Sequence, residues 1–180
     1  MNLIFFDLDG TLLNSASEIS PFTKETLALL DGKNIAYTVA TGRSMLSAKS
    51  ILKGHDFILP QVYNNGVTIW DPKSQELTLE HLLGSQEISM VIDLAISQGI
   101  TPFVHAIDDQ HYFIYHSAPC HKIEEELINT RYCHAKAKIL SIEELPANSQ
   151  VTNISMIGVA KAINPILQEL KKNPNLVSYS

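Results

Sequence analysis

The stretch that decides the fold is Met1-Asn2-Leu3-Ile4-Phe5-Phe6-Asp7-Leu8-Asp9-Gly10-Thr11-Leu12-Leu13-Asn14. Residues 3–6 are all apolar rather than alternating, which predicts a strand buried in a parallel sheet. Asp7 and Asp9 follow at its carboxyl end, where open α/β sheets bind ligands, and Gly10-Thr11 ends the strand. Two carboxylates two residues apart leave a strand on the same side and repel one another unless a cation lies between them. The sequence therefore predicts a chemically active, cation-dependent strand end.

The composition predicts a globular protein without nucleic-acid or membrane partners. The chain has 180 residues, of which 45% are hydrophobic and 18% charged, enough for one sizeable core or two small ones. The net charge is −6 and the longest basic run is Lys171-Lys172, which argues against nucleic-acid binding. Two cysteines, Cys120 and Cys133, give no disulfide framework. With no signal peptide and no apolar run of bilayer length, we expect a cytoplasmic protein.

Residues 1–83 alternate predicted strands and helices. Ser20 and Pro21 are typical of a helix start, and a second continuous apolar run ends at Thr41-Gly42-Arg43. The elements expected are a helix at 21–30, strands at 35–40 and 57–59, a helix at 45–52, and a hairpin with strands at 67–70 and 77–79. This spacing predicts an α/β fold with a Rossmann-like, doubly wound parallel sheet.

Residues 84–180 follow another pattern, so we place a domain boundary near residue 83. The elements expected are a helix at 88–96, a hairpin with strands at 100–106 and 112–116, a helix at 118–131, a strand at 151–159, a helix at 160–172 and a strand beginning at 176–179. This order predicts an α+β unit with helices on one face of an antiparallel sheet.

The segment Asp7-Leu8-Asp9-Gly10-Thr11-Leu12 resembles the first motif of the haloacid dehalogenase superfamily of phosphatases. The resemblance implies that Asp7 is the nucleophile that forms an aspartyl-phosphate. It also implies that Asp9 protonates the leaving oxygen and then activates water, a division of labour that carboxylates in different environments can support. Gly10 permits a tight turn, and the backbone N–H groups at Leu8 and Gly10 are expected to bind phosphate oxygens. A calcium loop would need a different spacing of acidic residues.

Thr41-Gly42-Arg43 is similar to the second motif of the same superfamily. The resemblance implies that the Thr41 hydroxyl and the backbone at Gly42 hold the phosphoryl group, and the following helix N-terminus favours an anion. Arg43 either reaches the substrate or braces the loop. Asn65-Gly66 resembles a substrate-side loop of the Cof-type class IIB branch, although a simple hairpin turn explains the same two residues.

The order of the two units also fits class IIB, whose members carry an α+β cap domain. This implies a Mg²⁺ ion held by Asp7 and Asp9, and a small phosphorylated metabolite such as a sugar phosphate as substrate. Phosphomutases share the branch's fold. The superfamily also uses a lysine and a Gly-Asp-x-x-x-Asp acidic pair from a later core segment, and neither is found in these residues. We therefore expect an incomplete core at 1–83 and a cap at 84–180 that lacks its last strand.

An incomplete core predicts an exposed apolar edge and face beside the first strand. A missing C-terminal core segment or another chain, as in a homodimer, would cover this surface, or else the fold is fragile. The main functional hypothesis is a Mg²⁺-dependent phosphatase. The alternative is a truncated, non-catalytic remnant that acts as a binding or dimerisation module.

A cluster of cysteines and histidines raises a zinc hypothesis, with adjacent Cys-His pairs at 120–121 and 133–134 and single histidines at 105, 111 and 116. Only His111 and His116 come close to the spacing of structural zinc ligands. Core cysteines and surface histidines explain the pattern better.

Overall fold

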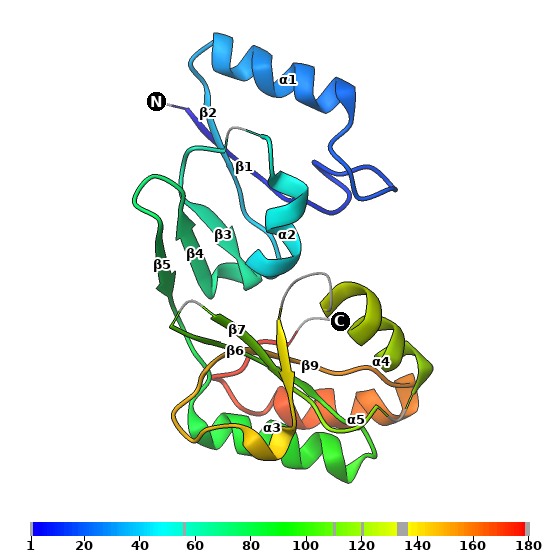
Figure 1. The fold of residues 1–180 in the computed structure, drawn as a ribbon. Coiled ribbons are helices and arrows are strands. Elements are labelled where there is room, and N and C mark those ends of the chain that lie inside the picture. The colour runs from blue at the N-terminus through cyan, green and yellow to red at the C-terminus, as the bar shows by residue number, and fades with distance from the viewer. Residues whose placement is uncertain (1, 56, 110, 120, 133–136, 179–180) are drawn as a thin grey trace. The chain divides into compact units, whose positions relative to one another are not determined.

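The computed structural model describes residues 2–55, 57–109, 111–119, 121–132 and 137–178, and it shows a mixed α/β fold (Figure 1). The chain divides into two compact units, 1–81 and 82–180, close to the boundary predicted near residue 83. Each unit has its own sheet structure. We therefore describe them one at a time.

Unit 1 begins with a parallel strand pair. Strand β1 (Leu3–Phe6) pairs with β2 (Ala36–Val39), and helix α1 (Pro21–Gly32) connects them. Helix α2 (Met45–Leu52) leads to an antiparallel sheet of β3 (Gln61–Tyr63), β4 (Thr68–Asp71) and β5 (Glu76–Leu79), with a 3₁₀ turn, η1 (Asn64–Gly66), between β3 and β4. A parallel bridge between Ala40 and Val62 links the two sheets. The predicted parallel arrangement is thus present in the β1–β2 pair and this bridge.

The two helices of unit 1 begin where their capping residues predict. The Ser20 hydroxyl accepts the Thr23 amide at 3.1 Å, and Pro21 occupies the first turn of α1, where its missing N–H has no cost. The Ser44 hydroxyl likewise accepts the Ser47 amide at 3.3 Å at the start of α2. Each cap satisfies a backbone donor that would otherwise lack a partner.

The strand predicted at 57–59 is wrong. Pro60 follows it and has no N–H to donate to a strand ladder, so pairing begins only at Gln61. Phe57 instead packs its buried ring edge-on against Tyr37, with 5.6 Å between ring centroids. The buried Thr38 hydroxyl donates to the Pro60 carbonyl oxygen at 2.8 Å, which fixes this connection against β2.

Unit 2 is a four-stranded sheet with the strand order β8-β7-β6-β9. Strands β6 (Phe103–Asp108), β7 (His111–Tyr115) and β9 (Gln150–Ser155) were predicted, although β9 ends four residues earlier than residue 159. Its helices are α3 (Ser85–Ser97), α4 (Lys122–Glu126) and α5 (Ala160–Leu170), with a π-helical segment η2 (Leu127–Tyr132) and a 3₁₀ turn η3 (Ile142–Glu144). Strand β8 (Lys138–Leu140) was not predicted, and because it runs parallel to β7, the sheet is mixed rather than antiparallel.

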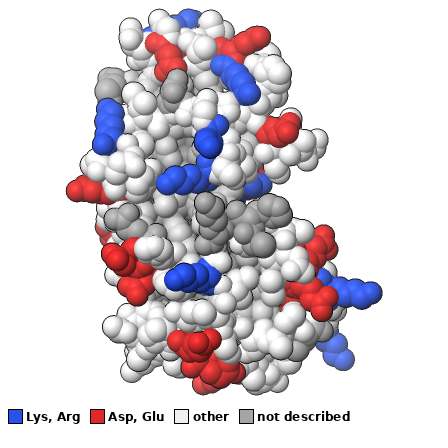
Figure 2. Space-filling model, in the orientation of Figure 1, with Lys and Arg blue, Asp and Glu red and all other residues white. Residues whose placement is uncertain are grey.

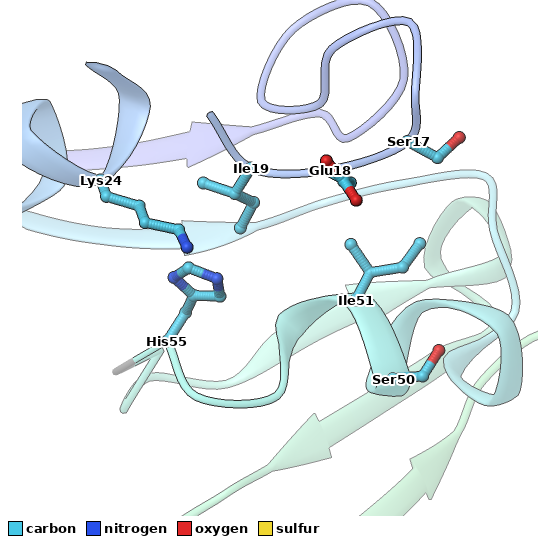
Figure 3. A pocket seen from close by; sticks show the side chains of 7 residues that line it. All are labelled: Ser17, Glu18, Ile19, Lys24, Ser50, Ile51 and His55. Carbon is cyan, nitrogen blue, oxygen red and sulfur yellow. The ribbon is translucent and has the colours of Figure 1, made fainter. Parts of the chain in front are cut away.

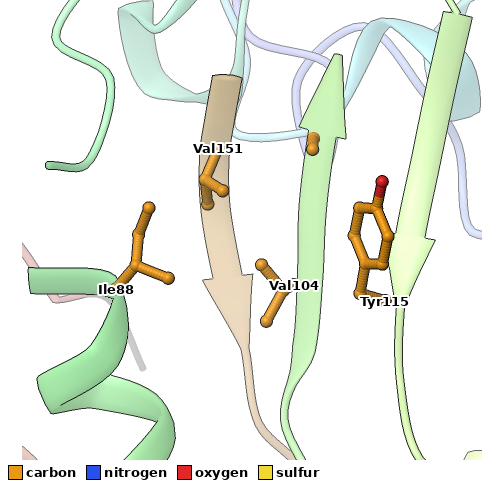
Figure 4. Packing of buried hydrophobic residues seen from close by; sticks show 5 residues of the cluster. Ile88, Val104, Tyr115 and Val151 are labelled. Atoms are coloured by element: carbon orange, nitrogen blue, oxygen red, sulfur yellow. The ribbon is translucent and has the colours of Figure 1, made fainter. Parts of the chain in front are cut away.

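One face of this sheet packs against α3 and α5. Ile88 of α3 belongs to one buried cluster with Val104, Ala106, Tyr115 and Val151, which come from one face of the sheet (Figure 4). A second cluster joins α3 to α5 through Val91, Ala95, Ile100, Ile166 and Leu170. Alternate side chains of the strands therefore supply one wall of the core, and the apolar stripes of the two helices supply the other.

Helices lie on both faces of the sheet, contrary to the expectation of one covered face. Glu124 of α4 approaches the buried ring of His116, with 4.0 Å between Oε2 and Nε2. The Tyr132 ring contacts Phe103 and His105, whose side chains point away from the α3 side. The helix predicted at 118–131 begins at Lys122 because His121 is its N-cap, and it widens into a π-helix after Glu126.

The expectation of surface histidines is wrong for His105 and His116. His105 is bonded to the Ser155 hydroxyl at 3.0 Å, and burial lowers the pKa of its imidazole to about 4. His116 stacks on Phe103 with 3.8 Å between ring centroids. Among the described residues no group of three or more His, Cys, Asp or Glu side chains is placed to hold a metal ion. Cys120, Cys133 and His134 lie outside the described residues.

The last predicted strand, at 176–179, is also wrong for the part that can be compared. Residues 176–178 form no strand, and residue 179 lies outside the described residues. Leu176 instead packs against the cluster between α3 and α5. Leu176 is therefore used for helix packing, whereas Val177 is exposed.

The prediction that β1 is a buried strand is wrong, and its apolar side chains are partly exposed, as expected for an incomplete core. Leu3 is 42% and Phe5 55% exposed, and both lie on the same face because they are two residues apart. β1 pairs with β2 along one edge, and in the described part of the chain no strand pairs with its other edge. This edge and face are the largest apolar exposure on a strand of unit 1.

Charges of both signs are interspersed on the face shown in Figure 2, in agreement with the absence of a long basic run in the sequence. Over the described ranges, the structure contains no helix with the length and hydropathy needed to cross a bilayer.

Ile166→Ala tests the packing of unit 2. Ile166 is fully buried between α3 and α5, so we expect a loss of about 2–5 kcal/mol in the free energy of unfolding. Ile96→Ala on α3 is the matched control, because Ile96 is 55% exposed and should cost less than about 0.5 kcal/mol. Urea unfolding followed by circular dichroism measures both variants, and equal losses would contradict the packing described here.

Candidate active site

The first polar loop, which contains Asp7 and Asp9, begins directly after β1 and is anchored by a buried leucine. Asp7 and Asp9 are exposed, whereas Leu8 between them is fully buried. The Leu8 carbonyl oxygen accepts the amides of Leu12 at 3.1 Å and Leu13 at 2.9 Å, and Gly10 has a φ of +72°. The segment is therefore a tight turn rather than a continuing strand, and Gly10 is suited to its positive φ. Both carboxylates remain at the surface of this turn.

Asp7 is held by its own loop. Its Oδ1 accepts the Leu8 amide at 2.7 Å, which is the one hydrogen bond of this carboxylate within the described part of the chain. The Leu8 amide, predicted to bind phosphate, is therefore engaged by Asp7 in this structure. Asp7 is an exposed residue, so its carboxylate is accessible from solvent.

The second polar loop, which contains Thr41, Gly42 and Arg43, follows β2 and lies at the same end of the strand pair as the first loop. Ala40 N–H donates to the Phe6 carbonyl oxygen at 2.9 Å, so the chain leaves β1 and β2 side by side. Thr41 is 5% exposed, and its hydroxyl oxygen accepts the Arg43 amide at 3.2 Å. Because that hydroxyl acts as an acceptor toward Arg43, its own hydrogen can be donated to a ligand.

The Asn-Asn-Gly turn braces this second loop. The amides of Asn64 and Asn65 donate to the carbonyl oxygens of Arg43 at 2.9 Å and Thr41 at 3.1 Å. A Cβ added at Gly42 would lie 3.0 Å from the Asn65 side-chain oxygen, so glycine allows the close approach. Asn65 thus belongs to the turn between β3 and β4, as the hairpin interpretation expects. It also lies against the predicted phosphate-binding loop at Gly42.

Asn64 was missed by the sequence analysis, which named only Asn65. Asn64 is 8% exposed, its Nδ2 donates to the Thr68 hydroxyl at 3.2 Å, and its φ is +49°. Asparagine is enriched at such left-handed positions. The signal in the sequence was the repeated asparagine before glycine, which indicates two consecutive left-handed residues.

Arg43 connects the two loops through an ion pair with Asp9. Its Nε donates to Asp9 Oδ2 at 2.7 Å and its Nη2 to Oδ1 at 2.6 Å, so both carboxylate oxygens are engaged. Nη2 also lies 3.4 Å from the Ser17 hydroxyl, which the sequence analysis did not single out. The hydrogen bond and the charge of Asp9 raise the pKa of Arg43, while partial burial opposes that shift. The bidentate geometry fixes where the Asp9 side chain lies.

A polar depression of about 440 Å³ lies on another part of unit 1 (Figure 3). It is lined by Ser17, Glu18, Ile19, Lys24, Ser50, Ile51 and His55. Figure 3 shows the Lys24 amine pointing toward the His55 ring. Apart from Ser17, which also lies next to Arg43, its lining is separate from the two polar loops. The predicted site residues are therefore gathered at the loops and not in this depression.

The acidic groups at the loops fit a magnesium ion only in part. Mg²⁺ prefers octahedral oxygen coordination, and the exposed Asp7 carboxylate is a suitable oxygen donor. Both side-chain oxygens of Asp9, which was predicted to help hold the ion, are instead bonded to Arg43 in this arrangement.

Comparison with known proteins now decides the family. A family model described as haloacid dehalogenase-like hydrolase matches residues 4–180. The chain belongs to this family. Both polar loops of this family member lie within the matched range, as does all of unit 2.

Individual relatives are longer than this hydrolase family member. Over 111 residues it is 32% identical to the 5-amino-6-(5-phospho-D-ribitylamino)uracil phosphatase YwtE of Bacillus subtilis, a match that covers 62% of this chain and 37% of the relative. A haloacid dehalogenase-like hydrolase from Bacteroides thetaiotaomicron has a similar structure, with a TM-score of 0.66 and 22% identity over 94% of this chain and 62% of that one. The subclass IIB sugar phosphatase BT4131 gives a TM-score of 0.71 and 18% identity over 93% and 63% of the two chains. The chain thus spans less than two-thirds of the length of these proteins.

Asn64 variants test the bracing of the second loop. Asn64→Ala removes the buried hydrogen bond to Thr68 and puts alanine, which tolerates a positive φ less well than asparagine, at a φ of +49°, so we expect a loss of about 2–4 kcal/mol in the free energy of unfolding. Asn64→Gly loses the hydrogen bond but tolerates the φ, and should cost about 1–2 kcal/mol less than the alanine variant. Urea unfolding compares the two, and a glycine variant as unstable as the alanine variant would contradict the role of the backbone conformation.

Proposed function

We propose that this protein is a Mg²⁺-dependent phosphatase that acts on small phosphorylated metabolites through an aspartyl-phosphate on Asp7. The main support for this proposal is the position of the two polar loops. They follow the paired strands β1 and β2 at the same end of the pair and are joined by the bidentate Arg43–Asp9 contact. Family membership supports phosphoryl transfer. The names of two relatives, a phosphoribitylaminouracil phosphatase and a sugar phosphatase, support a sugar phosphate or similar metabolite as the substrate class.

In the first step, a carboxylate oxygen of Asp7 attacks phosphorus and the bond from phosphorus to the leaving oxygen breaks. Asp9 gives a proton to that leaving oxygen, so the alcohol departs uncharged. In the second step, a water oxygen attacks phosphorus, Asp9 takes the water proton, and the bond between Asp7 and phosphorus breaks to release phosphate. The hydrogen bond from Leu8 N–H fixes one oxygen of Asp7 and leaves the other oriented for attack.

The second loop would hold the phosphoryl oxygens during both steps. The Thr41 hydroxyl can donate while its oxygen accepts from Arg43 N–H, and the Gly42 backbone lies next to it. The amino end of α2, capped by Ser44, adds a favourable potential for an anion. The backbone amide at Gly10 is the corresponding donor in the first loop.

A bound Mg²⁺ would neutralise charge on the phosphoryl oxygens and fix their position. The carboxylate of Asp7 and the main-chain oxygen of Asp9 are the groups of this chain that would hold it. We also infer that unit 1 is the amino-terminal part of a Rossmann-like core and that unit 2 is a class IIB cap. The fold similarity to the subclass IIB sugar phosphatase supports this assignment.

Asp7→Asn tests the proposed nucleophile. Wild-type protein with Mg²⁺ should hydrolyse p-nitrophenyl phosphate, and the variant should lose at least about 10³-fold in kcat, because an amide is not a nucleophile toward phosphorus. Asp93→Asn is the matched control, since Asp93 is an exposed carboxylate on α3 and its loss should leave the rate unchanged. Activity that survives Asp7→Asn would contradict the role of Asp7.

The exposed face of β1 favours a second candidate function, a dimerisation module. Edge strands with free backbone groups pair readily with other strands, and the apolar Leu3 and Phe5 side chains add area that water disfavours. We propose a second copy of the chain as the occupant, because two β1 edges related by a two-fold axis present the same donors and acceptors to one another.

Phe5→Lys tests this second candidate by sedimentation. The wild-type protein should sediment as a dimer at micromolar concentration, and the variant as a monomer, because a charge in the pairing face costs desolvation. Phe22→Lys on α1 is the control, since Phe22 is 77% exposed at another element and its replacement should leave the dimer intact. A monomeric wild-type protein would exclude the dimerisation module.

A further inference from the structure

The Arg43 guanidinium binds Asp9 through two of its three nitrogen atoms. Nε and Nη2 engage the two Asp9 oxygens, and Nη2 also contacts Ser17. Within the described part of the chain, Nη1 forms no hydrogen bond. The Arg43 side chain is 23% exposed and that of Asp9 58% exposed, so both charges remain accessible to a dissolved anion.

The backbone of Arg43 belongs to the loop proposed to hold the phosphoryl group. Its amide donates to the Thr41 hydroxyl oxygen, its carbonyl oxygen accepts from Asn64 N–H, and Ser44 next to it caps α2. The side chain alone reaches away to the first loop. Rotation of that side chain can therefore move the guanidinium without disturbing the braced backbone.

An ion pair of this exposure is easily exchanged. Exposed salt bridges contribute little, because water solvates both partners well. A phosphoryl group carries more negative charge than a carboxylate and presents oxygens at a spacing that matches the same guanidinium fork. A phosphorylated molecule at Thr41 would therefore compete with Asp9 for Arg43.

We propose that Arg43 exchanges partners: it holds Asp9 in the free protein and moves to the phosphoryl oxygens when a phosphorylated molecule binds. The inference rests on the proposed function and extends it. While Arg43 holds both oxygens, Asp9 has neither available for a leaving oxygen or a water molecule. Binding of the phosphoryl group releases the Asp9 oxygens when the reaction needs them. In the absence of a phosphorylated molecule, the ion pair with Arg43 keeps these oxygens engaged.

Binding of inorganic phosphate to four proteins, measured by isothermal titration calorimetry without Mg²⁺, tests the exchange. They are the wild type, Asp9→Asn, Arg43→Gln and the double variant. Asp9→Asn frees Arg43, so phosphate should bind about tenfold more tightly than to the wild type. In the Arg43→Gln background, the same Asp9→Asn change should alter the affinity by less than about twofold. Asp9→Ser repeats the test should the asparagine variant fail to fold.

Two controls sharpen the test. Arg43→Lys keeps the charge but loses the fork, and should recover only part of the affinity lost in Arg43→Gln. Ser17→Ala removes the weaker contact of Nη2 and should leave phosphate affinity within about twofold of the wild type.

Two outcomes would overturn the inference. A gain from Asp9→Asn that persists in the Arg43→Gln background would show that Asp9 acts by simple charge repulsion and that no exchange occurs. If none of the proteins binds phosphate, Arg43 does not bind a phosphoryl group in exchange for Asp9. Neither result decides the proposed function, which is judged by turnover of the wild type with Mg²⁺ and its loss in Asp7→Asn.

Discussion

The parallel pairing of β1 with β2 is the interaction on which the site depends. Four residue pairs, from Leu3 with Ala36 to Phe6 with Val39, hold the two strands in one register. Because parallel strands end at the same edge, this register places Asp7 and Thr41 at one level, and the Arg43–Asp9 ion pair then ties the loops together. A shift of one residue would turn each β1 side chain to the opposite face and separate the loops from their buried anchors Leu8 and Thr41.

Local features of the sequence predicted much of this arrangement. The continuous apolar runs located β1 and β2, and the Ser20 cap located the start of α1, because these signals depend only on neighbouring residues. The motif at Asp7–Thr11 and the motif at 41–43 predicted the family, which the match over residues 4–180 confirms. The roles of Asp7, Asp9 and Thr41 in phosphoryl transfer stay predictions.

Features that depend on distant residues were not predictable in the same way. Arg43 and Asp9 are 34 positions apart, so the sequence left open whether the arginine reaches the substrate or braces the loop. Strand β8, which pairs in parallel with β7, has only three residues, and three residues are too few to show a periodic pattern of apolar side chains. His105 and His116 were assigned to the surface, yet each lies inside unit 2, where it makes one hydrogen bond through one ring nitrogen and contacts an aromatic ring.

Trapping the phosphorylated protein identifies the residue that accepts the phosphoryl group during turnover. The protein is mixed with a phosphorylated substrate and Mg²⁺, quenched in acid during turnover, and digested for mass spectrometry. We expect one added phosphoryl group on the peptide that contains Asp7, and none on any peptide of the Asp7→Asn variant. Turnover accompanied by a phosphoryl group on another residue, or by no covalent intermediate, would contradict the role of Asp7 as the nucleophile.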